Sequence, residues 1–382
     1  MFDTSFIEIS RSALKKNLEF IRNQIDNNIK LSSVVKGNAY GHGIKKFIPL
    51  AEEFGIDHFS VFSSKEALET FESKVNSNTK IMIMGMIPNG KIEWAIKNDI
   101  EFYVFELDRL KTTNEIATKL NKKALVHINV ETGMNRIGFE KHEMEKVVNY
   151  LRSDYIQFQG LCTHFAGAES IANYYRVTNQ IKIFKRIIHQ FQKKNLNPKR
   201  IHCASSAATM NYPNTRFNMV RIGILQYGLW PSKETLIHYL GKHNKRKNPI
   251  QRIINWKSCV MNTKNISSGN FIGYNNTFQA QEDMKIAVIP VGYTNGYSRS
   301  LSNHGSVIIN GNKVKVIGTV NMNMLIVNIS EIPYTKKGNE VLLIGNQNGQ
   351  EITVSAFGEY TNQMNYESLA RLPADIPRKI IE

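Results

Sequence analysis

The stretch Val34-Val35-Lys36-Gly37-Asn38-Ala39-Tyr40-Gly41-His42-Gly43 places one lysine at the end of an apolar run and follows it with three glycines. Residues 31–35 mix β-branched and small residues and predict a buried strand, which puts Lys36 where the strand leaves the sheet. The glycines let the chain turn before a helical pattern over residues 44–54. A lysine held at such a strand end loses its proton more easily and can form a Schiff base. From these ten residues alone, an ordinary solvated lysine on the surface is an equally good interpretation.

The alternation of strand and helix patterns around this stretch indicates the fold class. Helical patterns separate eight predicted strands, at residues 31–36, 58–63, 80–85, 101–105, 124–130, 158–165, 200–205 and 219–225. Parallel strands need such crossovers, and eight of them can close into a (β/α)8 barrel. An open, doubly wound sheet is the alternative. It is weakened because residues 37–43 lack the G-x-G-x-x-G spacing of a dinucleotide site.

A second region begins after the charged run His243-Asn244-Lys245-Arg246-Lys247. Short strand patterns follow it, separated by Gly and Asn, and Asn310-Gly311 and Asn348-Gly349 are typical hairpin turns. The sequence therefore predicts a barrel domain over residues 1–245 and a C-terminal all-β domain over residues 246–382.

Composition narrows the class of protein. The chain has 382 residues, of which 42% are hydrophobic and 21% charged, as is ordinary for a globular protein. The net charge of +17 comes from lysines and arginines spread along the chain, which argues against nucleic-acid binding. No apolar run approaches the roughly 20 residues of a membrane span, and residues 1–10 do not form a signal peptide, so we expect a cytoplasmic protein. Three scattered cysteines and unpaired histidines predict neither a disulfide framework nor a metal site.

Polar residues gather where a barrel would place its chemistry, at the carboxyl ends of the strands. They are Lys36, Tyr40, Arg136, His164, Ser206 and Arg221. Gly223 and Ile224 offer backbone N–H groups to an anion after the last strand, the usual phosphate position of barrel enzymes. A lysine, a phosphate cradle and a strand-borne arginine together suggest pyridoxal phosphate. The alternatives are a loop ion pair between Arg136 and Glu131 and a structural, interior His164.

Tyrosines stand beside glycines in the second region, at Tyr274 and in the segment Pro290–Arg299. In most proteins such tyrosines are half-buried aromatic packing residues. If one of them faces Lys36 across a bound cofactor, two bases flank one carbon, and a proton can leave on one face and return on the other. That arrangement predicts racemisation.

The chain resembles the alanine racemases from Phe6 through Arg378. Five segments, in family order, carry the resemblance: Val34–Gly43, Glu131–Gly138, Thr163–Phe165, Arg221–Leu229 and Pro290–Arg299. The resemblance implies that pyridoxal 5'-phosphate forms an aldimine with Lys36, which is the base on the D side. It also implies a head-to-tail homodimer in which Tyr274 of the other subunit is the base on the L side.

The resemblance assigns roles to further residues. His164 would hydrogen-bond Tyr274, and Arg221 would keep the pyridine nitrogen unprotonated, because a guanidinium does not give up its proton. Arg136 would contact the phenolic oxygen and the substrate, and the backbone N–H of Met322 would bind the substrate carboxylate. The phosphate would be held by Tyr40, Ser206, Gly223, Ile224 and Tyr366. Tyr293 and Tyr366 would narrow the entrance, which fits the small substrate alanine and the supply of D-alanine for peptidoglycan.

The chain departs from the family pattern at several positions. Asn129 stands where many members have a lysine that becomes carbamylated and orients Arg136, so Arg136 needs another partner, such as chloride. Thr319, Asn321 and Asn323 surround Met322 in place of the usual arginine, cysteine and aspartate, and Asp375 replaces an arginine. Two alternatives stay open: a broader racemase that accepts serine or lysine, and a barrel that binds pyridoxal phosphate without turnover.

Overall fold

The computed structural model describes residues 3–360 and 364–382 and divides into two compact units. We call Ser12–Lys36 with Phe47–Arg252 the barrel unit. The β unit comprises Met1–Arg11, Gly37–Lys46 and Ile253–Glu382. The sequence predicted a single boundary between residues 245 and 246. The β unit also contains two N-terminal segments, which that boundary assigns to the barrel, because the residues they contact lie far away in sequence.

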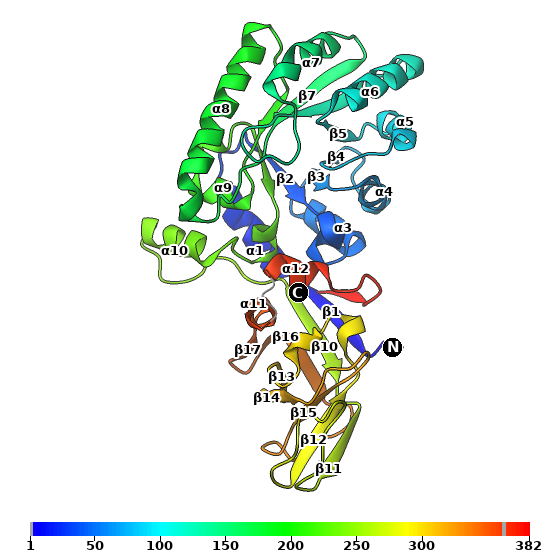
Figure 1. Ribbon diagram of the computed structural model, residues 1–382, viewed down its shortest axis with the longest axis vertical. Helices are drawn as coiled ribbons and strands as arrows, with labels where there is room; N and C mark the ends of the chain where they lie inside the picture. The colour runs from blue at the N-terminus through cyan, green and yellow to red at the C-terminus, as the bar shows by residue number, and fades with distance from the viewer. Residues whose placement is uncertain (1–2, 361–363) are drawn as a thin grey trace. The chain divides into compact units, whose positions relative to one another are not determined.

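The barrel unit contains one sheet of eight parallel strands (Figure 1). In sheet order they are β8 (Arg200–His202), β7 (Ile156–Cys162), β6 (Ala124–Asn129), β5 (Glu101–Val104), β4 (Lys80–Ile83), β3 (His58–Val61), β2 (Lys30–Val34) and β9 (Met219–Ile222). A backbone hydrogen bond of 3.0 Å from the N–H of Arg221 to the carbonyl of Ala204 links the two ends of the sheet. The sheet is therefore a nearly closed barrel, as the sequence predicts.

Helices connect the strands and lie around the outside of the barrel (Figure 1). They are α1 (Arg11–Arg22), α3 (Ile44–Glu53), α4 (Ser64–Ser73), α5 (Asn89–Lys97), α6 (Leu107–Leu120), α7 (Met144–Leu151), α8 (Tyr174–Lys193), α9 (Ser206–Asn211) and α10 (Lys233–Lys242). Local sequence explains their positions. In α1, Leu14, Leu18 and Ile21 recur at helical spacing and are buried. Helix α4 begins with a capping box between Ser63 and Glu66.

The β unit is a mostly antiparallel sheet, which confirms the predicted second region. Its main path runs β11 (Asn262–Ile266), β12 (Met284–Ile289), β15 (Leu325–Asn328), β14 (Asn312–Ile317), β13 (Ser306–Ile309), β16 (Glu340–Gln347), β10 (Ile254–Cys259), β1 (Ser5–Ser10) and β18 (Arg378–Ile381). β17 (Gln350–Ile352) pairs with β16. Strand β1 pairs with β10 and β18, so the first strand of the chain belongs to this sheet and not to the barrel.

Two short helices add to the sheet of the β unit, α11 (Val354–Glu359) and α12 (Asn365–Ala370). Neither helix was predicted from the sequence, because six residues are too few for a helical period to be distinguished from a turn. They matter for the site, since Tyr366 lies on α12.

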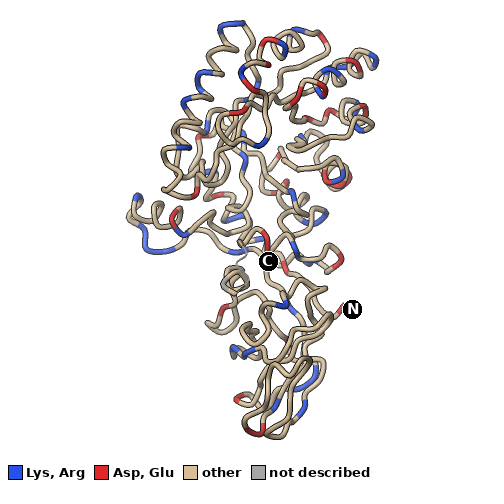
Figure 2. Tube along the Cα trace, in the orientation of Figure 1, with Lys and Arg blue, Asp and Glu red and all other residues tan. Residues whose placement is uncertain are grey.

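Lysines and arginines are spread along helices and loops of both units (Figure 2). This distribution agrees with the absence of a dense basic stripe in the sequence. Over the described ranges, the structure contains no helix with the length and apolar character required to span a membrane.

Candidate active site

Lys36 follows the end of β2, where the backbone N–H of Val35 is still bonded to the carbonyl of Ser60 at 2.9 Å. The lysine therefore starts from a fixed point of the barrel. Desolvation by the surrounding protein lowers the pKa of Lys36, and the positive charges of Arg136 and Arg221 lower it further. A depressed pKa increases the fraction of uncharged amine, which is the form that attacks a carbonyl group.

A left-handed turn, labelled α2 (Lys36–Tyr40), follows the lysine. Gly37, Asn38, Ala39 and Tyr40 all have φ between 50° and 62°. The glycines predicted to form the turn do not account for it alone, since three of these four residues carry a side chain. Such residues cost roughly 1–2 kcal/mol each in this conformation. Strain of this kind persists only where surrounding contacts impose it, which is typical of functional sites.

Contacts within the β unit hold this turn in place. The side chain of Asn38 accepts the N–H of Ile44 at 3.0 Å, at the start of α3. The guanidinium of Arg378 donates to the carbonyl of Gly41 at 2.9 Å. A Cβ at Gly41 would collide with the carbonyl of Leu369, so this glycine is needed for close approach as well as for its φ of 79°.

Arg221 lies on β9 and is 7% exposed. Its guanidinium donates to the hydroxyl of Tyr103 at 2.9 Å and to the carbonyls of Thr163 and Cys203 at 2.7 and 3.1 Å. Three acceptors from three different strand ends thus fix its position. Among the described residues, Arg221 Nε is buried without a hydrogen-bond partner. This N–H is therefore available to an acceptor that the protein does not supply, such as a ring nitrogen.

His164 follows β7 and is half-buried. Burial, then the charges of Arg221, Arg136 and Lys36, lower the pKa of His164 to about 3. The imidazole is therefore neutral at physiological pH. In the described part of the chain, its Nδ1 has no hydrogen-bond partner, which differs from the satisfied interior histidine considered as the alternative.

The loop that carries Arg136 is organised by Glu131. Its carboxylate accepts the backbone N–H groups of Met134 at 2.7 Å, Asn135 at 2.9 Å and Arg136 at 3.3 Å, and also that of Gly133. Although burial opposes it, these bonds lower the pKa of Glu131. The structure shows no ion pair between the side chains of Glu131 and Arg136 within the residues described. The loop ion pair is therefore wrong, because Glu131 is engaged by the backbone.

The expected phosphate contacts fall into both units. In the barrel unit, Ser206 Oγ accepts the N–H of Gly223 at 3.0 Å. The expectation that this N–H is bare is therefore wrong. Ile224 begins the short helix η4 (Ile224–Tyr227). In the β unit, the rings of Tyr40 and Tyr366 lie 5.9 Å apart.

Tyr274 and Met322 belong to the β unit. Tyr274 is 68% exposed in a loop whose neighbours Gly273, Asn275 and Asn276 all have positive φ, and its carbonyl accepts the hydroxyl of Thr319 at 3.1 Å. Met322 is 54% exposed, and its carbonyl accepts the N–H of Thr294 at 3.1 Å. The backbone N–H of Met322 has no protein partner in the described ranges and can receive a carboxylate.

Comparison with known proteins agrees with this geometry. Residues 9–231 match the family model described as alanine racemase, N-terminal domain, and residues 253–380 match alanine racemase, C-terminal domain. The alanine racemase of Leptospira interrogans is 34% identical over 381 residues, which cover 99% of this chain and 96% of that protein. The chain belongs to the alanine racemase family.

Solved structures of alanine racemases have the same fold. That of Clostridium difficile 630 gives a TM-score of 0.92 at 28% identity and covers 100% of this chain and 96% of the other. That of Bartonella henselae, described with covalently bound pyridoxal phosphate, gives a TM-score of 0.85 at 26% identity, with 99% and 100% covered. The predicted class, an alanine racemase built as a barrel with a C-terminal β region, is confirmed.

Sequence reasoning missed residues that hold the alanine racemase site together. Tyr103 accepts a hydrogen bond from Arg221, and Gln226 and Tyr227 donate to the carbonyl of Val34, two residues before Lys36, at 3.1 and 2.9 Å. A signal was present for Tyr103, since Glu101 and Tyr103 occupy alternate positions of one predicted strand and so share a face. Gln226 and Tyr227 lie within the motif Arg221–Leu229, but nothing local indicated their contact with Val34, because that partner is distant in sequence.

Proposed function

We propose that this chain interconverts L- and D-alanine with pyridoxal 5'-phosphate bound at Lys36, and that Lys36 and Tyr274 are the two bases. The observation that carries the proposal is the lowered pKa of Lys36 at a strand end, beside the charges of Arg136 and Arg221. The match to both family domains supports it, and so does the bound cofactor of the Bartonella henselae relative.

The residues of the barrel unit fit the cofactor. The buried Arg221 Nε–H suits a pyridine nitrogen as acceptor, and a guanidinium leaves that nitrogen unprotonated. Ser206 and Ile224 would hold the phosphate on this unit, and Gly223 would contribute by fixing the Ser206 hydroxyl that accepts its N–H. Tyr40 and Tyr366 would be the contacts contributed by the β unit. The cofactor supplies electron withdrawal from the substrate's α-carbon, which makes the α-proton removable.

Proton transfer is the work of the chain's own side chains. The Lys36 amine would take or give a proton at the α-carbon on the D side, and the Tyr274 hydroxyl would do so on the L side. A neutral His164 would position the tyrosine. Because Tyr274 is so exposed on its own chain, we propose that it completes the site of a second copy in a homodimer.

The residues on the substrate side bear on the choice between alanine and other amino acids. Arg136 and the free N–H of Met322 would bind the substrate carboxylate. Asn321 and Asn323 flank Met322 where the family pattern differs, and the Asn323 amide donates to the hydroxyl of Thr294 at 3.0 Å. A broader racemase that also accepts serine or lysine is the second candidate, and these two amides favour it. A non-catalytic barrel is disfavoured by the match of residues 253–380 to the C-terminal racemase domain.

Borohydride reduction tests the lysine directly. The expected result is loss of the visible cofactor absorption and, after peptide mapping, a label on Lys36 alone. The Lys36→Ala variant should lose both the label and racemisation, whereas Lys45→Ala, a change of the same kind on an exposed residue nearby, should keep both. A label on another lysine would overturn the assignment.

The tyrosine needs its own variant and control. Tyr274→Phe should reduce kcat by about 10²–10⁴, the usual contribution of a general base. Tyr334→Phe removes the hydroxyl of a tyrosine that is 65% exposed elsewhere in the β unit, and it should leave kcat unchanged. Assays with both enantiomers of alanine, serine and lysine separate the narrow racemase from the broad one, since comparable turnover of serine or lysine would contradict the narrow assignment.

A further inference from the structure

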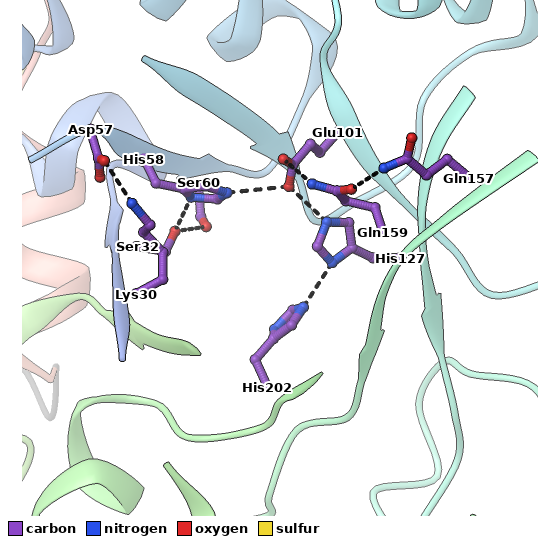
Figure 3. A network of polar contacts seen from close by, with 10 residues as sticks. All are labelled: Lys30, Ser32, Asp57, His58, Ser60, Glu101, His127, Gln157, Gln159 and His202. Carbon is purple, nitrogen blue, oxygen red and sulfur yellow. Dashed lines mark hydrogen bonds and ion pairs between the residues drawn. The ribbon is translucent and has the colours of Figure 1, made fainter. Parts of the chain in front are cut away.

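A polar network fills the interior of the barrel, where bulky apolar side chains usually pack (Figure 3). Its centre is Glu101 on β5, which is 2% exposed. Within the described ranges, Glu101 is the only carboxylic acid in the buried set, whereas that set includes three arginines, Arg109, Arg221 and Arg378. A lone buried carboxylate calls for a physical reason, because burial of an unpaired charge is costly.

Both oxygens of Glu101 have partners. Oε2 accepts His127 Nε2 at 2.8 Å and His58 Nε2 at 3.2 Å, and Oε1 accepts the amide of Gln159 at 2.8 Å. His127 Nδ1 lies 2.8 Å from Nε2 of His202. Although burial opposes it, the bonds from His127 and His58 hold the pKa of Glu101 well below its usual range. Glu101 therefore carries its negative charge inside the barrel.

The ionised Glu101 determines the tautomers of the histidines. Burial lowers the pKa of both His127 and His202, so both rings are neutral. A carboxylate only accepts, which means that His127 must carry its proton on Nε2. Its Nδ1 is then an acceptor, and His202 must donate from Nε2. The remaining His202 Nδ1 is left as an unprotonated acceptor, and it has no hydrogen-bond partner among the residues described.

The chain makes room for this arrangement at a specific position. Gly160 on β7 lies opposite His127 in the strand register. A Cβ at residue 160 would overlap the ring of His127, with its Nδ1 as the nearest atom. The absence of a side chain on β7 thus lets His127 on β6 reach His202 on β8.

The network is connected to Arg221. The ring of Tyr103, two residues after Glu101 on the same strand, lies 6.1 Å from that of His127 and 6.0 Å from that of His202. The Tyr103 hydroxyl accepts the Arg221 guanidinium. Arg221 is also among the charges that act on both histidines. The network therefore reaches the arginine through the ring and hydroxyl of Tyr103, and within the described residues Glu101 itself makes no hydrogen bond or ion pair with Arg221.

A metal site is the obvious alternative for three histidines and a glutamate. Metal ligands direct their lone pairs at one common point. Here the nitrogens are bonded to Glu101, to each other and, at His58 Nδ1, to the hydroxyl of Ser32 at 2.8 Å. In the part of the chain that the structure describes, no group of these residue types is arranged to hold a metal ion.

We propose that Glu101 is a buried counter-charge for Arg221, that it acts through the neutral rings of His127 and His202, which lie beside Tyr103, and that these three are positioning residues for the cofactor-facing guanidinium. The proposal rests on the proposed function. A carboxylate in direct contact would compensate most of the charge of Arg221. A carboxylate separated from it by neutral rings instead stabilises the arginine inside the barrel and leaves Nε–H free to donate to the ring nitrogen.

The first test is the protonation of the histidines in the intact wild-type holoenzyme. Nitrogen-15 NMR of histidine-labelled protein distinguishes protonated from unprotonated ring nitrogens. We expect His127 and His202 to be neutral, with the proton on Nε2, at neutral pH. A protonated Nδ1 on His202, or a positively charged His127, would overturn the proposal without any variant and without an activity assay.

The second test is Glu101→Gln, with Ser60→Ala as the matched control on the His58 side of the network. The amide removes the negative charge and offers one acceptor and one donor in place of two acceptors, so His127 is no longer obliged to carry its proton on Nε2 and the tautomers should change. We expect an altered visible spectrum of the bound cofactor and a loss of kcat of at least about tenfold with little change in KM, since a hydrogen bond to a charged group is worth that factor. Ser60→Ala should change neither the tautomers nor kcat.

The outcomes separate this proposal from the proposed function. Unchanged tautomers and an unchanged cofactor spectrum in Glu101→Gln, even with reduced activity, would mean that the network serves stability alone and would overturn the inference. If wild-type protein shows the expected tautomers but no racemisation, the proposed function fails, and the counter-charge role at the cofactor fails with it, while the assigned tautomers stand.

Discussion

Gly160→Ala is the perturbation that the structure predicts most sharply. The added methyl group would overlap His127, and β7 is hydrogen-bonded on both sides, to β6 and to β8, so the backbone cannot yield. His127 would have to leave Glu101 and His202. Losing the bond to the carboxylate costs about 2 kcal/mol and losing the neutral bond about 1 kcal/mol.

Two further contributions complete the expected magnitude. Overpacking adds about 1–3 kcal/mol, and replacing glycine by alanine in a strand returns about 0.5–1 kcal/mol. The net expected decrease in the free energy of unfolding is therefore about 3–5.5 kcal/mol. Urea denaturation of cofactor-free protein, followed by far-ultraviolet circular dichroism, measures it as a shift of the midpoint at constant m-value.

Two comparisons make this experiment decisive. Gly241→Ala places the same methyl group in α10, where no atom lies within 4 Å, and should be neutral or stabilising by up to about 1 kcal/mol. In a His127→Ala background, Gly160→Ala should lose its effect, because the ring it displaces is gone. If Gly160→Ala is as stable as the wild type, or costs the same with and without the ring of His127, the reasoning about this network is refuted.

The remaining predictions concern the turn after Lys36, acid stability and the departure at Asn129. Asn38→Ala and Asn38→Gly both remove the side chain that caps Ile44, but at φ 54° alanine should be less stable than glycine by about 1 kcal/mol in urea denaturation, and equal midpoints would contradict the strain. Full burial lowers the pKa of His42 from 6.5 to about 4, so the unfolded chain binds more protons between these values and stability falls as the pH drops. Titration of His42 should lower the free energy of unfolding by about 2 kcal/mol at pH 5 relative to pH 8. The His42→Gln variant, which does not titrate, should lack that part of the pH dependence in urea denaturation. Racemisation should be insensitive to bicarbonate in the wild type, because the Asn129 amide cannot form a carbamate, and a measured bicarbonate requirement would count against this reading of Asn129.

The strands and helices of the barrel were predictable from local pattern. Eight apolar runs separated by helical spacing require parallel strands, and the charged run at residues 243–247 marked the approach of a different architecture. Lys36 was found for the same reason, since a strand end followed by glycines is a local feature. The family motifs were also contiguous segments, which a sequence displays directly.

Contacts between distant residues were decided only by the tertiary structure. The left-handed conformation of Ala39 and Tyr40 opposes their intrinsic preference and is imposed by partners such as Arg378, more than 330 residues away. Glu131 accepts hydrogen bonds from the backbone of its own loop, and Ser206 accepts the N–H of Gly223. Both sets of hydrogen bonds depend on geometry that residue type does not specify.

The charge network shows the same division. The sequence placed Glu101, His127 and His202 within three predicted strands, because alternation and apolar neighbours are encoded locally. It did not indicate that one carboxylate would fix two tautomers. That hydrogen-bond chain requires the three strands to be in register and requires a residue without a side chain, Gly160, on the strand between His127 and His202. Periodicity along the chain thus determined the elements, and close packing across the barrel determined which polar groups met.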